Sequence, residues 1–343
     1  MINAAIVGLG WWGKNLVNSV NTPGSGTEAS DAIRFSVGHS RHRDAAAPFC
    51  AEAGLTWVSD FESILADRAI DAVVLATPHR LHGTQILRAV AAGKHVFVEK
   101  PIALSVAEAR TSIHAAEQAG LVLAVGFNRR FHPSMAMLRQ EIQAGRFGTL
   151  VSISAEQTAL HGLTLQPEAW RAQPEESPAG AMTAIGVHLV DGMIDLFGPI
   201  GEVYAQVARR ASPAADDTTD IMVRFENGAS GHIVCSTTAT PNYRMAVYGT
   251  EAFAEIVGHP METFRLVPAS GSEQTQVTKN FNMLRQELEA FAASIESRRP
   301  FPTPLSQILH GVAVFEAVVR SVQTGQRERV AAERVAAERV AAT

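Results

Sequence analysis

The sequence has little cysteine and no excess of basic charge. Its two cysteines, Cys50 and Cys235, are too few for a disulfide framework or a cluster of metal-binding thiolates. Both lie among apolar residues, so we expect two small core side chains. The formal net charge of −5 provides no attraction for nucleic acid or for an anionic membrane surface. We therefore expect neither nucleic acid nor a membrane as a partner, and no bound metal.

Long hydrophobic runs are lacking as well. We find no apolar run long enough to span a bilayer and no basic segment followed by an apolar leader, so the cytoplasm is the expected compartment. Hydrophobic residues make up 46% of the chain and charged residues 18%, as in ordinary globular proteins. A chain of 343 residues is too long for one typical core, which predicts two domains.

The first part of the chain alternates short apolar strands with helices. Strand followed by helical crossover, repeated several times, is typical of a doubly wound parallel sheet. The strand over 72–76 is almost entirely apolar, as expected for a strand buried on both faces. Strands are predicted over residues 3–7, 33–38, 56–58, 72–76, 95–98 and 121–125.

A glycine-rich loop follows the first strand, with the sequence G-L-G-W-W-G over residues 8–13. Gly8 permits a tight turn, Gly10 lets backbone amides approach a pyrophosphate, and Gly13 lets helix and strand pack closely. The anion would lie at the N-terminus of the next helix, where unpaired amides favour negative charge. Because this loop stands between a strand and a helix, we expect a dinucleotide there, with Trp11 and Trp12 beside it.

The end of the second strand predicts which dinucleotide is bound. An acidic residue at this place would bind the 2′-hydroxyl of an adenosine ribose, but the chain has Ser40, Arg41 and Arg43 instead. Guanidinium groups form charge-assisted hydrogen bonds with phosphate oxygens, so these residues favour NADP. A solvated basic turn, with NAD as the cofactor, is the alternative.

Two further strand ends carry polar residues. Ligands of open parallel sheets bind beyond the carboxyl ends of the strands, and these ends carry Thr77-Pro78-His79 and Glu99-Lys100-Pro101. Pro101 has no amide proton for a central strand and holds Lys100 in an extended or turn-like backbone. His82 lies in the first turn of the helix that follows His79, where a structural role is the alternative.

The second part of the chain has a different pattern. Strands joined by short turns indicate a mainly antiparallel sheet. They are predicted over 151–157, 203–209, 221–225, 229–237, 245–248 and 252–257, with helices over 181–197, 281–297 and 305–324. The repeated E-R-V-A-A is a low-complexity segment. We therefore predict domains over residues 1–126 and 127–327, and a helical or disordered tail over 328–343.

Four motifs occur in order: the glycine loop, Glu99-Lys100-Pro101, G-F-N-R-R-F-H-P from Gly126, and G-V-H-L-V-D from Gly186. Together they resemble the Gfo/Idh/MocA oxidoreductases, over nearly the whole chain. The resemblance implies an α/β protein in which a nicotinamide-binding Rossmann domain precedes an α/β domain with a large, mainly antiparallel open sheet. It also implies that this sheet supports substrate binding and the contacts of a homodimer or homotetramer.

The resemblance assigns roles to particular residues. Lys100 is expected to reach the substrate oxygen and His188 to move the hydroxyl proton, for which a near-neutral imidazole is suited. Asp191 either orients the His188 ring or lies on the helix surface. The expected cofactor residues are Gly8, Gly10, Trp11, Trp12, Gly13, Ser40, Arg41, Arg43, Thr77, Pro78, His79, His82, Glu99, Lys100 and Asn128. The expected substrate residues are Lys100, Asn128, Arg129, Trp170, Arg171, Thr183 and His188.

One position departs from the family pattern. Many members carry an aspartate four residues before the histidine, where this chain has Ala184. Alanine neither orients a hydroxyl nor holds charge, so Thr183, Asn128 or the substrate itself must replace the missing contact, or catalysis is lost. We interpret the chain as an NAD(P)-dependent oxidoreductase that transfers hydride between nicotinamide and a secondary alcohol or ketone of a sugar, cyclitol or related polyol. The alternative is a catalytically silent NAD(P)-binding regulator of the same family.

Overall fold

The computed structural model describes residues 1–21 and 28–331, which form two units. The first contains Met1–Ala103, Ala107–Asn128 and Asn282–Leu305. The second contains Leu104–Val106, Arg129–Phe281 and the chain from Ser306 onward. The predicted boundary near residue 126 is therefore close to one of the places where the chain passes from one unit to the other, between Asn128 and Arg129. The prediction that everything from 127 to 327 forms one domain is wrong, because Asn282–Leu305 returns to the first unit.

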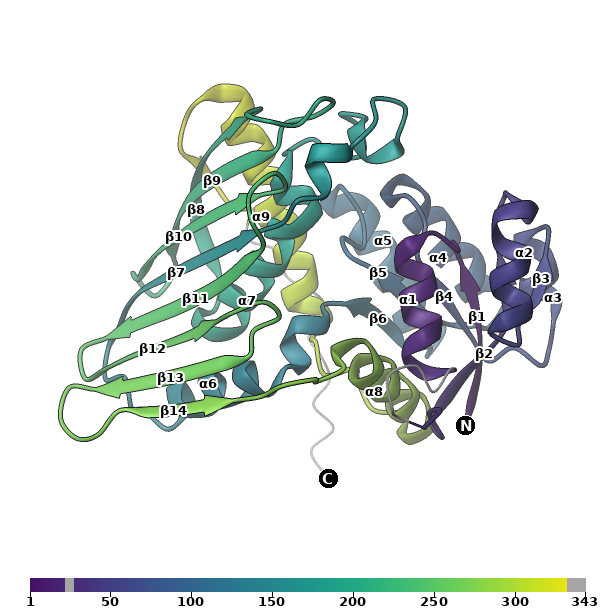
Figure 1. Cartoon of the computed structure of the whole chain (residues 1–343), viewed down its shortest axis with the longest axis horizontal. Helices are drawn as coiled ribbons and strands as arrows, with labels where there is room; N and C mark the ends of the chain where they lie inside the picture. Colours follow the sequence, from purple (N-terminus) through teal and green to yellow (C-terminus); the bar gives the residue numbers. More distant parts are fainter. Residues whose placement is uncertain (22–27, 332–343) are drawn as a thin grey trace. The chain divides into compact units, whose positions relative to one another are not determined.

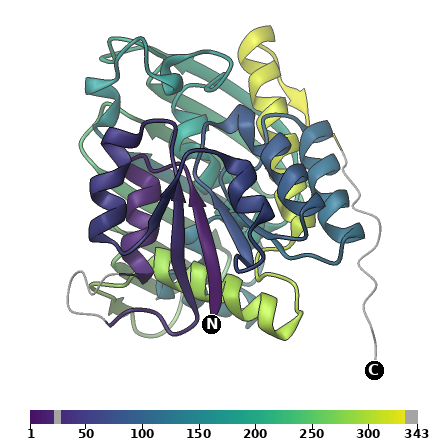
Figure 2. The ribbon, with the colours of Figure 1, turned by 90° about the vertical axis from the view of Figure 1, so that its right-hand side faces the viewer.

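A six-stranded sheet forms the centre of the first unit, in the order β3-β2-β1-β4-β5-β6. All five neighbouring pairs are parallel, which confirms the predicted doubly wound sheet (Figure 2). The order reverses direction between β1 and β4, so the loops after these two strands border the place where such sheets bind ligands. The strands are β1 (Ile2–Val7), β2 (Ile33–His39), β3 (Thr56–Val58), β4 (Ala72–Leu75), β5 (His95–Glu99) and β6 (Leu123–Gly126).

Helices surround this sheet. Those between the strands are α1 (Trp11–Val20), α2 (Arg43–Glu52), α3 (Phe61–Ala66), α4 (His82–Ala91) and α5 (Val106–Gln118). The helix that returns to the unit is α8 (Met283–Ser297), which contacts α1 and β2. Its Phe291 meets Phe97 of β5 edge to face, with ring centroids 5.7 Å apart. The apolar stripe of α8 is thus buried against the parallel sheet, although the chain reaches it only after most of the second unit.

A nine-stranded sheet forms the second unit, in the order β14-β13-β12-β11-β7-β10-β9-β8-β15. Only β7 and β10 pair in parallel among the described strands of this second sheet, so the prediction of a mainly antiparallel sheet is confirmed. The strands are β7 (Leu150–Thr158), β8 (Ile200–Ala208), β9 (Thr218–Phe225), β10 (Ser230–Ser236), β11 (Asn242–Gly249), β12 (Ala252–Val257), β13 (Thr263–Pro268), β14 (Gln274–Val277) and β15 (Glu328–Arg329). The last three were not predicted.

Three helices of this unit, α6 (Pro133–Gln143), α7 (Val187–Phe197) and α9 (Leu305–Thr324), lie against one face of the sheet (Figure 1). Helix α9 is long and apolar enough to cross a membrane by length and composition alone, contrary to the expectation that no such run exists. Its Phe315 and Val318 are fully buried in the core. We therefore interpret α9 as a core helix.

The predicted tail begins as a strand. Glu328 and Arg329 form β15, which pairs with Val203 and Glu202 of β8, so the expectation of a helical or disordered segment is wrong for these residues. Residues 332–343 of that tail lie outside the described residues. The two cysteines are both buried, which confirms that they are core side chains.

Candidate active site

The glycine loop after β1 has three glycines with three different surroundings. Gly8 has φ +103°, and a Cβ there would lie 2.4 Å from the Ala76 carbonyl oxygen. A Cβ at Gly13 would lie 1.9 Å from the Gly8 oxygen, so both positions exclude every other residue. A Cβ at Gly10 would meet no described atom within 4 Å. Gly10 is the N-cap of α1 and makes no side-chain cap bond, so no side chain at this position competes with a pyrophosphate for the first amides of α1.

Two tryptophans stand at the start of α1, directly after this cap. Trp11 is 76% exposed. Trp12 is half-buried, and its Nε1 has no hydrogen-bond partner among the described residues. The two rings are 5.5 Å apart at an angle of 44°. The loop therefore presents a large apolar surface and an unused N–H donor beside the predicted pyrophosphate site.

The carboxyl end of β2 carries cations and no acidic residue. Arg41 is exposed, and the Arg43 guanidinium lies 5.3 Å from the centre of the Trp57 ring. The Ser40 Oγ accepts a hydrogen bond from the His42 amide at 3.5 Å. Asp44, the nearest acidic residue that follows, lies in the first turn of α2. The donor set is suited to a phosphate rather than to a ribose hydroxyl.

His82 joins the ends of β4 and β5. It is fully buried, with Nδ1 2.9 Å from the Pro101 oxygen and Nε2 3.0 Å from the Thr77 oxygen. Burial lowers its pKa to about 4, so the ring is neutral and donates to one of the two carbonyls only. This position supports the two loops from behind, and a direct contact of His82 with the cofactor does not fit it.

The other residues of the β4 loop are buried to different degrees. Thr77 is half-buried, and its hydroxyl donates to the Gln85 side chain at 2.6 Å. Pro78 is the N-cap of a short 3-10 helix, His79–Leu81. His79 is buried, with its ring 5.9 Å from that of His82. Of the residues predicted here, Thr77 and Pro78 are therefore the ones placed at the very end of β4.

Glu99 ends β5, and the half-buried Lys100 follows it. The Lys100 amide donates to Glu99 Oε2 at 3.3 Å. On the neighbouring strand Gly126 pairs with Glu99, and a Cβ at Gly126 would lie 3.0 Å from Glu99 Oε1. A glycine at this place therefore makes room for the buried carboxyl. The strand stops before Pro101, as the missing amide proton requires.

Asn128 follows β6 and completes this edge of the sheet. It begins a 3-10 turn, Asn128–Phe131, and is only 6% exposed. Its side-chain oxygen has no hydrogen-bond partner among the described residues. Because buried polar atoms are usually paired, this oxygen is a candidate acceptor for a ligand hydroxyl.

The second unit holds the other predicted residues, and its cluster of buried charges was not predicted. Arg130 donates to both carboxyl oxygens of Asp191, from Nε at 2.8 Å and from Nη2 at 2.7 Å. Its Nη1 donates to Asp195 at 3.2 Å and to Gln307 at 2.6 Å, and Arg139 donates to the other Asp195 oxygen at 2.6 Å. Asp191 is thus neither a helix-surface residue nor chiefly a partner of His188; it ties α7 to the chain after β6.

Arg129, next to this cluster, lies against the sheet. Its guanidinium is 5.1 Å from the centre of the Tyr243 ring of β11. Burial lowers the pKa of Arg129 to about 10, although Tyr243 acts in the opposite direction. The side chain therefore remains a cation near neutral pH and can attract an anionic or hydroxyl-rich ligand.

The segment before His188 is a π-helix, Met182–Gly186, rather than the start of the predicted continuous helix. Gly186 permits it, because a Cβ there would lie 2.8 Å from Met182 Sδ and 2.9 Å from Cys235 Sγ. Such segments are frequent at functional sites. Thr183 is fully buried, with a hydroxyl that has no hydrogen-bond partner among the described residues. Ala184 is half-buried, and His188 is buried in the first turn of α7.

Trp170 and Arg171 form a short 3-10 turn, Trp170–Ala172. The Arg171 guanidinium stacks on the Trp170 ring at 4.1 Å from its centre. Trp170 is half-buried and Arg171 exposed. The stack holds the cation in a defined position, and binding of a substrate group by Arg171 stays a prediction.

Sequence reasoning missed two buried groups, Arg130 and Glu287. Asp191 and Asp195 lie one turn apart on a helix that is otherwise almost entirely apolar, and this spacing is a signal for a buried cation. Glu287 lies four residues before Phe291, at a position of α8 where helical periodicity predicts an apolar side chain. Both signals can be recognised in the sequence only when it is known which faces of α7 and α8 are buried.

Comparisons with known proteins agree with this geometry. Residues 2–127 match the family described as "Oxidoreductase family, NAD-binding Rossmann fold", and residues 135–255 match the "GFO/IDH/MocA C-terminal domain". The scyllo-inositol 2-dehydrogenase (NAD(+)) of Bacillus subtilis is 30% identical over 75% of this chain and 71% of that protein. The 1,5-anhydro-D-fructose reductase of Ensifer adhaerens is 28% identical over 80% of this chain and 84% of that protein.

The fold has solved counterparts. A levoglucosan dehydrogenase in complex with NADH and levoglucosan superimposes with a TM-score of 0.87, covering 96% of this chain and 99% of that one at 22% identity. At that identity the likeness concerns the fold alone. The two family matches and the sequence relatives carry the assignment: the chain belongs to the GFO/IDH/MocA oxidoreductase family.

Proposed function

We propose that this protein is an NAD(P)-dependent oxidoreductase that transfers hydride between nicotinamide and a secondary alcohol or ketone of a sugar, cyclitol or related cyclic polyol. The observation that carries the proposal is the edge of the parallel sheet, where an uncapped α1 N-terminus behind Gly10 and the half-buried Lys100 follow strands of one sheet. The names of the relatives, a dehydrogenase and a reductase of polyols and sugars, support the substrate class.

The chain's own residues would divide the chemistry as follows. The bound nicotinamide supplies the acceptor or donor of hydride. The Lys100 ammonium stabilises negative charge on the substrate oxygen, and His188 accepts or returns the hydroxyl proton. Arg130, through Asp191, fixes the helix that presents His188.

Ala184 leaves one contact to be replaced. The unpartnered Thr183 hydroxyl and Asn128 amide oxygen, both buried, supply the hydrogen-bonding capacity that an aspartate would otherwise provide. The alternative of a silent regulator gains no support from relatives that are named as enzymes. We therefore keep catalysis as the proposal.

A substrate panel tests this function. Sugars and cyclitols are supplied with NAD or NADP, and the absorbance of the reduced nicotinamide is followed. Lys100→Ala is expected to lower kcat by a few powers of ten with nearly unchanged cofactor affinity, because it acts mainly in the transition state. His188→Ala is expected to cost about 10²–10⁴-fold, the usual contribution of a general acid–base group. Full activity of the Lys100 variant, or cofactor binding without turnover of any substrate, contradicts the proposal.

We further propose NADP as the preferred cofactor, on the basis of Ser40, Arg41 and Arg43. A charge-assisted phosphate contact contributes about 1.5–3 kcal/mol, which is roughly tenfold to hundredfold in affinity. Arg41→Ala should therefore weaken NADP by that factor and leave NAD unchanged, as measured by calorimetry. Arg34→Ala, which removes another exposed arginine of β2, is the control. Equal affinities for both nucleotides, unaffected by Arg41→Ala, refute the preference.

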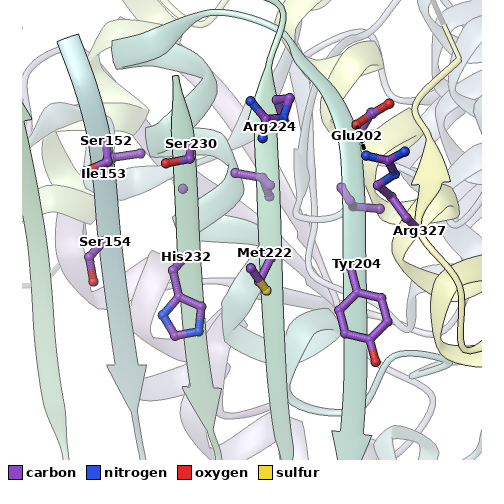
Figure 3. A pocket seen from close by; sticks show the side chains of 13 residues that line it. Ser152, Ile153, Ser154, Glu202, Tyr204, Met222, Arg224, Ser230, His232 and Arg327 are labelled. Atoms are coloured by element: carbon purple, nitrogen blue, oxygen red, sulfur yellow. Dashed lines mark ion pairs between the residues drawn. The ribbon is translucent and has the colours of Figure 1, made fainter. Parts of the chain in front are cut away.

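We also propose that the open face of the nine-stranded sheet binds a second copy of this chain, in a homodimer or homotetramer. No described helix covers this face, which has a hollow of about 760 Å³ lined by β7, β8, β9 and β10 (Figure 3). Met222 is 62% exposed there and Tyr204 39%, next to the Glu202–Arg327 ion pair at 3.2 Å. Apolar side chains among small polar ones favour burial against an identical face.

Light scattering at micromolar concentration tests the assembly. The parent protein should be a dimer or tetramer, and Met222→Arg should dissociate it by burying an unpaired charge. Val277→Arg, at an exposed position of the edge strand β14, is the matched control and should leave the assembly intact. A monomeric parent protein contradicts the proposal.

A further inference from the structure

Glu287 is a buried acid that the proposed chemistry does not yet use. It lies in the second turn of α8 and is 0% exposed. Neither of its carboxyl oxygens has a hydrogen-bond partner among the described residues. An ionised carboxylate in such a place is costly, and a carboxyl group there neutralises instead. Burial raises the pKa of Glu287 well above its usual value, Glu99 raises it further, and Lys100 acts in the opposite direction.

The packing of α8 on β5 explains why Glu287 acts on Glu99. Phe97 and Glu99 alternate along β5 and so face the same side of the sheet. Phe97 contacts Phe291, and Glu287 lies one helical turn before Phe291 on the same face of α8. The Phe97–Phe291 pair and the Glu99–Glu287 pair are therefore neighbours in one interface between β5 and α8. The acidic pair lies at the carboxyl end of the strand. Gly126, on the neighbouring strand, leaves space for the Glu99 carboxyl because it has no side chain.

Other charges near α8 are directed elsewhere. On α8 itself Arg285 and Glu289 pair with each other at 2.7 Å, and Glu296 pairs with the N-terminal amine at 3.0 Å. Lys14 of α1 lies over the Phe49 ring, and Arg34 of β2 is exposed. His39 of β2 contacts the Val58 oxygen. The groups that act on Glu287 are therefore Glu99 and Lys100.

We propose that Glu287 is a positioning residue for Lys100: only one of the carboxyls of Glu287 and Glu99 is ionised at a time, so the pair presents a single negative charge to the lysine. Two carboxyl groups held together away from water do not both ionise, and they lose their protons in two separate steps. One negative charge holds the ammonium at the end of β5 without the second charge that would compete with the substrate oxygen for it. This role rests on the proposed function of Lys100.

The lysine itself can report the state of the pair. The chain has four lysines, Lys14, Lys94, Lys100 and Lys279, so reductive methylation with ¹³C-formaldehyde gives few signals, and Lys100→Arg assigns the one of interest. In the parent protein the Lys100 signal should titrate in two steps, a smaller one when the second carboxyl of the Glu99–Glu287 pair ionises and a larger one when the lysine deprotonates. Glu287→Gln keeps the shape of the side chain and should abolish the smaller step. The pH profile of kcat/KM should lose the same inflection.

Glu296→Gln makes the same chemical change at an exposed position of α8 and should leave both steps of the Lys100 titration intact. The signals of the other three lysines should be the same in every variant. If Glu287→Gln is recovered unfolded, Glu99→Gln breaks the same pair and must abolish the same step. Identical Lys100 titrations in the parent and the Glu287→Gln protein overturn the proposal. Because this titration needs neither substrate nor cofactor, its outcome is independent of whether the panel detects turnover.

Discussion

The buried carboxyl of Glu287 predicts how the stability of the first unit depends on pH. Its folded-state pKa is raised by burial and by Glu99, whereas in the unfolded chain it is about 4.3. Between these two values the folded state binds a proton that the unfolded state has lost. The free energy of unfolding of the parent protein therefore falls as pH rises through this window, by about 1.4 kcal/mol per pH unit. Below the unfolded value the contribution is fully present, and above the folded value its loss is complete.

Glu287→Gln removes this dependence. The difference in unfolding free energy between the variant and the parent should rise in favour of the variant by about 1.4 kcal/mol for each pH unit above about 4.3, and level off above the folded pKa. Urea unfolding at a series of pH values measures it. In a Trp170→Phe background the remaining tryptophans, Trp11, Trp12 and Trp57, all belong to the first unit, so their fluorescence reports that unit. Glu296→Gln is the control. A difference that is the same at every pH means that Glu287 is ionised when folded, and refutes the reasoning.

Two further predictions concern the glycine loop and the buried ion pair. Gly13→Ala places a Cβ 1.9 Å from the Gly8 oxygen, so it should lower both thermal stability and nucleotide affinity. Gly10→Ala places a Cβ with no described atom within 4 Å, so it should lower nucleotide affinity alone. Calorimetry measures affinity and thermal melts measure stability, and equal effects of the two substitutions contradict the assignment. Asp191→Asn leaves the buried Arg130 cation short of a charged partner and should cost about 3 kcal/mol in urea unfolding; a cost below about 1 kcal/mol, typical of an exposed pair, shows that the pair is not buried in solution.

The sequence was sufficient where a pattern has only one explanation. Each strand of the parallel sheet is a short apolar run, and Gly8, Gly10 and Gly13 have the spacing typical of a dinucleotide-binding loop. Helix α8 was predicted almost to the residue, but its partner was not, because an apolar stripe does not say which sheet covers it. Strand β14 was missed because all four of its residues are exposed, which leaves no alternation to detect.

In the candidate site, too, residues in local patterns were predicted and residues that depend on packing were not. Lys100 stands at a strand end and was predicted from that position, and Asn128 was predicted from the family resemblance. The role of His82 depends on two carbonyls that only the folded chain brings together. The π-helix before His188 was missed because an apolar run such as Ala181–Gly186 has no periodicity that separates it from an α-helix. Arg130 and Glu287 depend on long-range packing, which no local pattern encodes.

The return of α8 to the first unit has a consequence for synthesis on the ribosome. Residues 1–128 leave the exit tunnel without the helix that covers Phe97, and 153 residues lie between Asn128 and Asn282. At about 5–20 residues per second, the nascent first unit waits roughly 8–30 seconds with that side of its sheet uncovered. During this interval the Phe97 side of the sheet lacks its partner helix, and a chain truncated at residue 281 would lack that helix permanently. Neither unit is therefore one continuous stretch of chain: the first is complete only at Leu305, and the second only after that residue.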